Sequence, residues 1–249
     1  MSKQEVSKVK KNELDRPSYV EAGDAGLEDV RPQDVMLPRL AIMQSLTPSV
    51  VEGQHKAGEL VNTLTGEAWV GVANEKTGEG EPVLVHPIKH YAQWIKWGDR
   101  DANEGMLEQS TDPQGALAKE AAVQRPVKDE KGKLRFAITE YHNFVITLPE
   151  SHPREMVVLS FSRSSHKTGR QLIGLAKARG HLPLFAGLYK LTTKRLTKGA
   201  NTYWVYVLEN AGWAPEADYC WAKDQNEALK GLTILSPVDE SNDEGGGEL

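Results

Sequence analysis

The stretch Arg154–Trp213 reads REMVVLSFSRSSHKTGRQLIGLAKARGHLPLFAGLYKLTTKRLTKGANTYWVYVLENAGW, and it predicts a strand, a short helix and a hairpin. The run Val157–Arg163 supplies the predicted strand. Leu184–Lys194 and Thr202–Glu209 alternate in polarity on either side of LTKGAN. Two alternating runs separated by a short glycine-containing segment predict a β-hairpin.

The helix of this stretch is predicted by its boundaries and by its two sides. Ser164 or Ser165 can cap its start, and Gly180 can end it. On a helical wheel the apolar and basic side chains fall on opposite sides. The apolar side holds Leu172, Ile173, Leu175 and Ala176, and the basic side holds Lys167, Arg170 and Lys177. The pattern indicates an amphipathic helix with a cationic outer face.

Charge separates this stretch from the rest of the chain. Arg154–Lys198 contains ten basic residues and one acid, Glu155, a net of +9, whereas the other residues hold 20 basic and 34 acidic side chains, a net of −14. An acidic protein that concentrates positive charge in one aromatic-containing stretch usually has an anionic partner. The alternative is a solvated helix face beside a lysine-rich hairpin tip.

Composition limits the class of protein. The chain has 249 residues, a net charge of −5 and one cysteine, Cys220, which rules out a disulfide framework or a cysteine-based zinc site within one chain. No apolar run is long enough to span a membrane, and the N-terminus has no apolar secretory signal. We therefore expect no membrane association and a location in the cytoplasm of a bacterium, or of a bacterial host infected by a virus.

The chain divides by composition into three parts. Residues 1–30 are polar and charged and predict a disordered arm, residues 31–235 predict one domain, and residues 236–249 predict an acidic disordered tail. Within the domain, residues 99–133 are low in aromatics and predict a long, partly helical insertion loop. The acids of the tail are Asp239, Glu240, Asp243, Glu244 and Glu248.

Prolines mark several predicted element boundaries. Pro38 should exclude a central strand near the start of the domain, and Pro87 should interrupt the strand that begins at Val83. Leu134–Leu148 predicts a further strand. Pro215 suits the first turn of a helix that reaches Lys230.

Enzyme signatures are missing from the sequence. It contains no glycine-rich phosphate loop, no GxGxxG and no HExxH. His86 and His90 are four residues apart, but Pro87 and the strand pattern keep them off one helical face. No pair of carboxylates stands out, and Cys220, in an aromatic-containing helix, is typical of a buried structural thiol rather than a nucleophile. We therefore expect a protein that is not an enzyme and has neither a cofactor nor a metal site.

Nucleic-acid binding fits the residues better. Proteins that hold single strands combine basic grooves, which follow the phosphates, with aromatic faces on which bases stack. For any one aromatic residue, packing in the core is the alternative. The candidate DNA-binding residues are Lys89, Tyr91, Trp94, Lys96, Trp97, Arg163, Lys167, Arg170, Lys177, Lys190, Lys194, Arg195, Lys198 and Tyr203. The strand-rich pattern predicts an α+β protein, mainly β with flanking helices, built on an OB-fold-like β-barrel.

Two runs carry a family resemblance. FVITLPESHPREMVVLSFSRSSHKTGRQL and PLFAGLYKLTTKRLTKGANTYWVYVLENAGW resemble the core of a family of single-stranded DNA-binding proteins from tailed bacteriophages. The resemblance covers Val35–Gly231. It implies an OB-fold, the coating of exposed strands during phage replication or recombination, and docking of replication or recombination proteins on the acidic tail. The tail departs from that family because it ends in Gly-Glu-Leu249 rather than in an aromatic residue.

Two other function classes stay open. A phage structural or host-takeover protein could use the basic hairpin to bind an acidic protein partner. A nuclease is disfavoured because no carboxylate cluster is present. The sequence does not indicate the oligomeric state, and a dimer is compatible with it.

Overall fold

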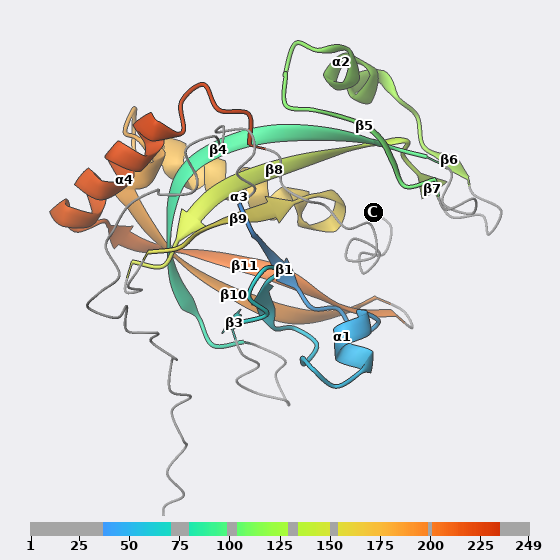
Figure 1. Cartoon of the computed structure of the whole chain (residues 1–249), viewed down its shortest axis with the longest axis horizontal. Coiled ribbons are helices and arrows are strands. Elements are labelled where there is room, and N and C mark those ends of the chain that lie inside the picture. Colours follow the sequence, from blue (N-terminus) through green and yellow to red (C-terminus); the bar gives the residue numbers. More distant parts are fainter. Residues whose placement is uncertain are drawn as a thin grey trace, which may run out of the picture. The chain divides into compact units, whose positions relative to one another are not determined.

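Two long neighbouring strands form the centre of the fold, β4 (Val83–Trp97) and β8 (Ile138–Thr147) (Figure 1). They pair antiparallel from His86 opposite Thr147 to Lys96 opposite Ile138. Both are rich in the β-branched and aromatic residues that suit a half-buried pleated surface. The computed structural model describes residues 37–70, 80–98, 104–128, 134–149, 154–198 and 201–234, all of which lie within the unit Met36–Leu249.

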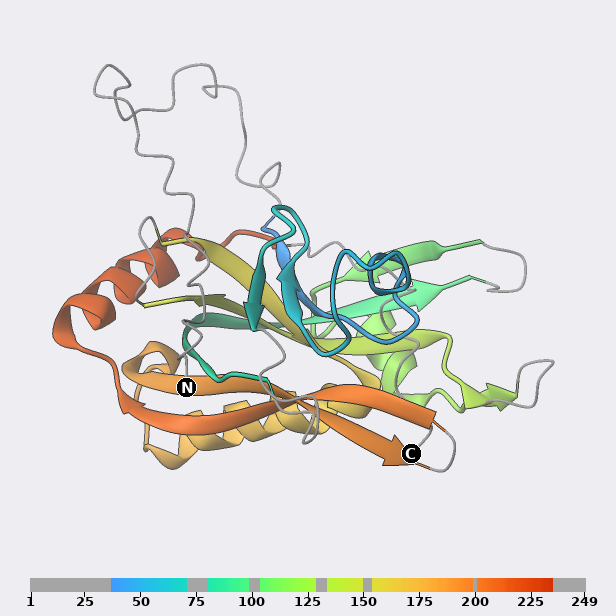
Figure 2. The same cartoon turned by 90° about the horizontal axis from the view of Figure 1, so that it is seen from below.

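The remaining strands extend this pair into one curled sheet. Its order is β11-β10-β4-β8-β9-β1-β2-β3, with β5 paired to β4, and the sheet curls into a half-barrel (Figures 1 and 2). Of its pairs, β1 with β9 is parallel and the others are antiparallel. The bounds are β1 Arg39–Ile42, β2 Leu60–Asn62, β3 Ala68–Val70, β5 Met106–Ser110, β9 Met156–Phe161, β10 Gly187–Lys198 and β11 Asn201–Trp213. A separate pair joins β6 (Val127–Lys128) to β7 (Leu134–Arg135).

The described residues contain four α-helices, α1 (Pro48–Val51), α2 (Ala116–Val123), α3 (His166–Ala178) and α4 (Glu216–Ala228). The predicted basic helix, the hairpin that follows it and the helix after Pro215 are therefore confirmed. None of these helices combines the length and apolar character needed to cross a bilayer. The prediction of an α+β protein made mainly of strands, with flanking helices, is also confirmed. The OB-fold stays a prediction.

Three sequence expectations need correction. Pro38 does not exclude a central strand, because β1 begins just after it and lies between β9 and β2. Pro87 does not end its strand either, since β4 continues through a register shift between Pro87 and Lys89. Pro87 also lies beyond the last β10 partner, Val85, so its missing N–H is not needed on that side. Cys220, expected to be a buried thiol, is exposed. The predicted insertion loop is partly helical as expected, because it contains α2, and it also contributes β5, a strand of the sheet.

The main apolar core fills the concave side of the half-barrel. It combines Phe144, Leu159, Leu191 and Tyr206 from four different strands with Leu172 from α3. Leu172 is buried while the basic side of α3 is exposed, as the helical wheel predicts. The apolar side of α3 therefore contributes to the core of the half-barrel.

Within the described part of the chain, side chains rather than another strand bond to the outer edge of β11. The Gln44 side-chain amide donates to the Trp204 carbonyl at 3.0 Å, and the Trp204 N–H donates to Gln44 Oε1 at 2.9 Å. From α3, the Thr168 hydroxyl donates to the Tyr206 carbonyl at 3.4 Å, and the Gln171 side-chain amide donates to the Leu208 carbonyl at 3.5 Å. These bonds occupy backbone groups that an open edge would leave for another chain.

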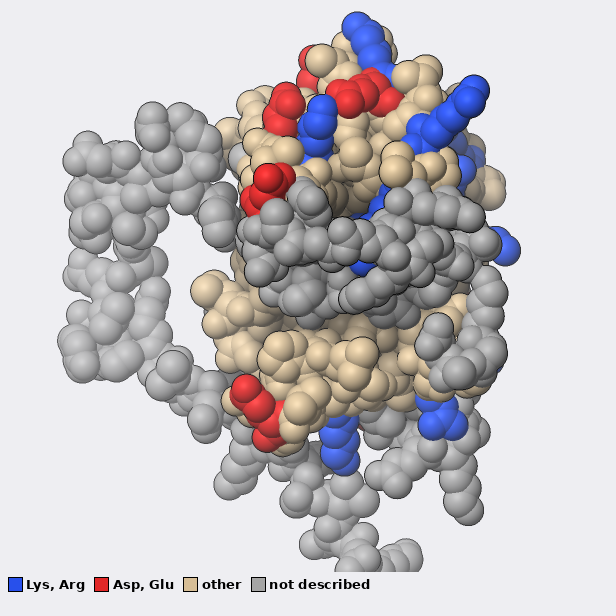
Figure 3. Space-filling model, turned by 90° about the vertical axis from the view of Figure 1, so that its right-hand side faces the viewer, with Lys and Arg blue, Asp and Glu red and all other residues tan. Residues whose placement is uncertain are grey.

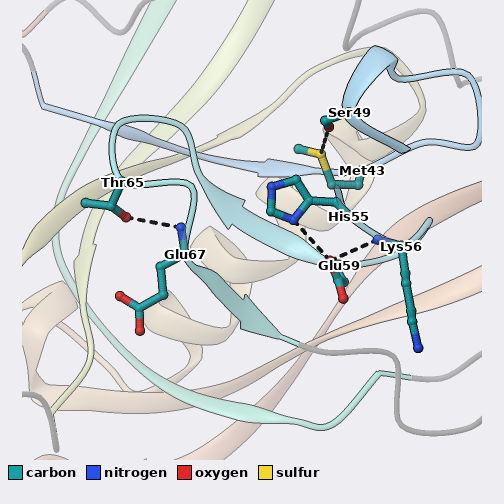
Figure 4. Close-up of polar contacts among 7 residues, drawn as sticks. All are labelled: Met43, Ser49, His55, Lys56, Glu59, Thr65 and Glu67. Atoms are coloured by element: carbon teal, nitrogen blue, oxygen red, sulfur yellow. Dashed lines mark hydrogen bonds and ion pairs between the residues drawn. The ribbon is translucent and has the colours of Figure 1, made fainter. Parts of the chain in front are cut away.

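The segment that carries Gln44 is held by its own polar contacts (Figure 4). Lys56 N–H donates to Glu59 Oε2 at 3.0 Å, His55 Nδ1 lies 3.3 Å from the same oxygen, and the Ser49 hydroxyl contacts Met43 Sδ at 3.5 Å. Next to it, Gly58 lies under the Trp204 ring, where an added Cβ would be 2.4 Å from the ring. The β1–β2 connection is thereby fixed against β11.

We expect Gln44→Ala to lower the free energy of unfolding by about 1–3 kcal/mol, because it leaves the N–H and carbonyl of Trp204 without protein partners. Urea denaturation followed by tryptophan fluorescence measures the change. Gln54→Ala is the control, since Gln54 is exposed and its side chain donates to Glu52 rather than to the backbone of another strand. Equal stability of the two variants would contradict the role of Gln44.

Candidate nucleic-acid interface

The register of the hairpin places two of its lysines and one tyrosine on the same side. Lys190 lies opposite Glu209, Lys194 opposite Val205, and Leu196 opposite Tyr203. The alternate residues of both strands, such as Leu191 and Leu208, are buried in the core. The outer hairpin face, defined as Lys190, Lys194, Leu196 and Tyr203, therefore points away from the core. Its lysines are exposed and Tyr203 is partly exposed.

Helix α3 lies along the edge of the same hairpin (Figure 2). Its three predicted cations, Lys167, Arg170 and Lys177, are all exposed. Because Thr168 and Gln171 face β11, the helix cannot rotate without losing its bonds to that strand. The helix and the hairpin thus present basic side chains on both sides of β11.

Arg154 and Arg179, two arginines of the basic stretch, bind other parts of the protein. Arg179 donates to the Gly212 carbonyl at 2.7 Å, and its guanidinium lies 5.1 Å from the Tyr189 ring centroid and 4.9 Å from that of Trp213. Arg154 forms an ion pair with Asp218 and lies over the Trp221 ring. These two arginines fasten the hairpin and α4, so the net charge of the stretch overstates what a ligand can reach.

The aromatic candidates on β4 are packed inside the protein. Trp94 and Trp97 are each only 7 % exposed. Trp94 packs on Leu117 of α2, and Trp97 packs on Tyr141 of β8. Their burial favours packing in the core, the alternative for any one aromatic residue, over stacking on bases.

The other β4 candidates also have internal partners. Lys96 forms an ion pair with Glu120 at 3.0 Å, and Lys89 donates to the Leu229 carbonyl at the end of α4. Burial lowers the pKa of Lys89. Tyr91 packs in the α4 cluster, and burial raises its pKa, against the opposing effect of Arg39. The structure therefore does not bring β4 candidates onto the hairpin surface.

The remaining candidates divide by position. Arg195 is exposed on the hairpin, and Arg163 is partly exposed just before α3 with a backbone φ of 42°. The Lys198 side chain and the five tail acids lie outside the described residues, as do the predicted arm and tail. On the face turned to the viewer in Figure 3, Lys and Arg stand among Asp and Glu, so charges of both signs are mixed there. The candidate interface is therefore defined by α3 and the hairpin.

The sequence did not predict a group of titratable side chains that lies beside α3. His142 of β8 stacks on His166 of α3, with ring centroids 4.4 Å apart, and its Nδ1 lies 3.3 Å from His90 Nε2. Glu140 Oε2 lies 3.7 Å from His166 Nε2. We call these four residues the histidine cluster. Glu140 and His142 share a strand face by their spacing, which was the available signal, but only tertiary structure adds His166.

Burial dominates the protonation of these histidines. It lowers the pKa of His142 to about 4, and the charges of His166, His90 and Arg170 act in the same direction. Burial also lowers the pKa of His90 and of His166, although Glu140 opposes the shift at His166. Burial also lowers the pKa of His86, although its 2.7 Å hydrogen bond to the Phe185 carbonyl opposes the shift. The folded protein therefore favours neutral imidazoles at these positions.

The chain matches the model of a known protein family. The family model described as Pam3 phage gp34-like protein matches residues 9–234, which is most of the chain. Searches of curated proteins and of solved structures find no match.

We expect Trp94→Ala to lower the free energy of unfolding by about 3–5 kcal/mol, because it removes a buried indole between α2 and the sheet. Val123→Ala on α2 is the control. Val123 is 79 % exposed, so this change should lower the free energy of unfolding by no more than about 0.5 kcal/mol. Chemical denaturation of both variants measures the difference. A Trp94 variant as stable as the control would contradict its place in the core.

Stability should fall as the pH falls from 6.5 toward 4. The unfolded chain binds protons at the ordinary histidine pKa of 6.5, whereas the folded pKa of His142 is about 4. The unfolded state therefore binds more protons in this window, and stability rises with pH across it. Urea midpoints between pH 4 and 7.5 measure the effect. His142→Gln should flatten the profile, the exposed His181→Gln should not, and an unchanged profile in His142→Gln would contradict the prediction.

Proposed function

The chain belongs to the Pam3 phage gp34-like protein family, and we propose that it binds single-stranded DNA, without catalysis, through the outer hairpin face and the basic side of α3. The observation that supports this most is the position of Tyr203. It lies diagonally across from Lys194, a spacing of roughly 7–8 Å that long side chains can bridge. A base stacked on Tyr203 would place its phosphates near the lysines of the hairpin.

The cations of α3 extend this surface. Helix α3 bonds to β11, the strand that carries Tyr203, and it presents Lys167, Arg170 and Lys177. A single-stranded DNA that crosses the hairpin would contact these cations next. Glu209, opposite Lys190, is the acid that the register places on the same hairpin side. Separated phosphate contacts with a single aromatic platform suit sequence-tolerant binding rather than base-edge readout.

The family and the charge distribution support a wider role. We place the activity in phage DNA replication or recombination, in the host bacterial cytoplasm, with the curled sheet serving as an OB-fold-like platform. The acidic tail from Asp239 to Glu248 would compete with DNA for the cations and dock replication or recombination proteins. Duplex DNA is the necessary comparison, because a two-stranded ribbon also fits the major groove.

Replacing Lys167, Arg170 and Lys177 together by Ala should weaken binding to a single-stranded oligonucleotide and lower the log–log salt slope by up to about 2 units. Tyr203→Ala should cost about 1–3 kcal/mol of binding while leaving the slope nearly unchanged, because stacking releases no counterions. Fluorescence anisotropy at several salt concentrations measures both.

The control replaces three exposed lysines away from the hairpin, Lys119, Lys223 and Lys230, by Ala. It removes the same charge from α2, from α4 and from the turn after α4, so affinity and slope should change much less. Equal losses in both triple variants would mean binding by bulk charge. Equal affinity for duplex and single strand at moderate salt would reject the proposal, and binding only to an acidic protein would favour the alternative class.

A further inference from the structure

The histidine cluster interrupts an otherwise apolar sheet face. On the same side of β8, Phe144 belongs to the main core and Ile138 to the cluster under α2. Glu140 and His142 lie between them, and His90 on β4 is the register partner of Phe144. Buried polar groups at such a position cost stability unless they have partners. Their presence between two apolar clusters therefore calls for a chemical explanation.

Three ligand atoms of the cluster lie close together, and two buried ring nitrogens of the cluster have no hydrogen bond. One ligand atom from each of Glu140, His142 and His166 lies within 4.8 Å of the other two. His142 is only 9 % exposed, and its Nε2 is buried without a hydrogen bond, as is His166 Nε2. Unsatisfied buried nitrogens that converge with a carboxylate are the arrangement that a cation would complete.

We propose that Glu140, His142 and His166 bind a divalent transition-metal ion of the Zn²⁺ class. Two neutral imidazoles and a carboxylate form a nitrogen–oxygen ligand set that suits this ion. Three protein ligands leave a fourth tetrahedral position for water or another small ligand. This site is separate from the outer hairpin face and does not depend on DNA binding.

Metal binding requires the His166 ring to turn out of its stack on His142, because an imidazole binds a metal ion in its ring plane. Tetrahedral bonds of 2.0–2.1 Å place ligand atoms about 3.3 Å apart. His166 Nε2 and Glu140 Oε2 are 3.7 Å apart, close to that spacing. Rotation of the stacked His166 ring about its side-chain bonds would bring its nitrogen toward His142. The ion would fasten the first turn of α3 to β8.

His90 is the positioning residue of the site. Its Nε2 lies 3.3 Å from His142 Nδ1, so it can hold the tautomer that leaves His142 Nε2 free to coordinate. Arg170 acts against the cation, since its charge lowers the pKa of both His142 and His166. Glu140 supplies the negative charge that offsets it.

Full-length protein freed of metal by chelation and dialysis tests the site. Isothermal titration with Zn²⁺ should give one site per chain, and Co²⁺ should give the intense visible absorption of a four-coordinate ion. Zn²⁺ should also raise the thermal midpoint, because it binds the folded state. Glu140→Gln and His166→Gln should each weaken Zn²⁺ binding by at least about 100-fold, and His90→Gln by about 10–100-fold.

Two controls keep the test decisive. His181→Gln, which removes an exposed histidine outside the cluster, should leave Zn²⁺ binding unchanged, and Arg170→Ala should tighten it. Circular dichroism and the metal-free thermal midpoint identify any variant that fails to fold, and Glu140→Gln changes a partly exposed side chain by one atom. Lack of Zn²⁺ binding at 100-fold molar excess, or equal binding by wild type, Glu140→Gln and His166→Gln, overturns the proposal. Stabilisation by inorganic phosphate and not by Zn²⁺ also overturns it, in favour of an anion site.

Discussion

The free edge of β11 is the constraint on which the rest of this structure depends. A curled sheet that ends in a long strand leaves a row of backbone N–H and carbonyl groups that must find partners. Gln44 satisfies both groups of Trp204, and side chains of α3 occupy carbonyls farther along. The β1–β2 connection and α3, which lie more than 100 residues apart in the sequence, are therefore held at the same strand.

This solution gives α3 several roles at once. Leu172 contributes to the core, Thr168 and Gln171 cover the strand edge, and the remaining side presents the cations to solvent. His166, at the start of the helix, meets β8 and completes the histidine cluster. A change that moves α3 would therefore disturb the core, the candidate interface and the cluster together.

Charge alone is a poor guide to the interface, because several basic side chains have partners within the protein. Arg179 lies between two aromatic rings, and the space above Gly187 is taken by its guanidinium, which would collide with any Cβ there. Lys89 donates to the Leu229 carbonyl at the end of α4, and Lys96 forms an ion pair with Glu120 of α2. Long basic side chains pack their stems on apolar surface as readily as they reach for phosphate.

Local pattern in the sequence determined α3, the hairpin and α4, because amphipathic periodicity, caps and alternation act over a few residues. It also determined which side of α3 is basic. It could not decide whether Trp94 and Trp97 face a ligand or the core, because that depends on α2 covering Trp94 and on Tyr141 of the neighbouring strand β8 packing against Trp97. Nor could it bring His166 to His142, which lie 24 residues apart and meet only when the helix packs on the sheet. Burial and convergence depend on contacts between distant segments, and only the tertiary structure decided them.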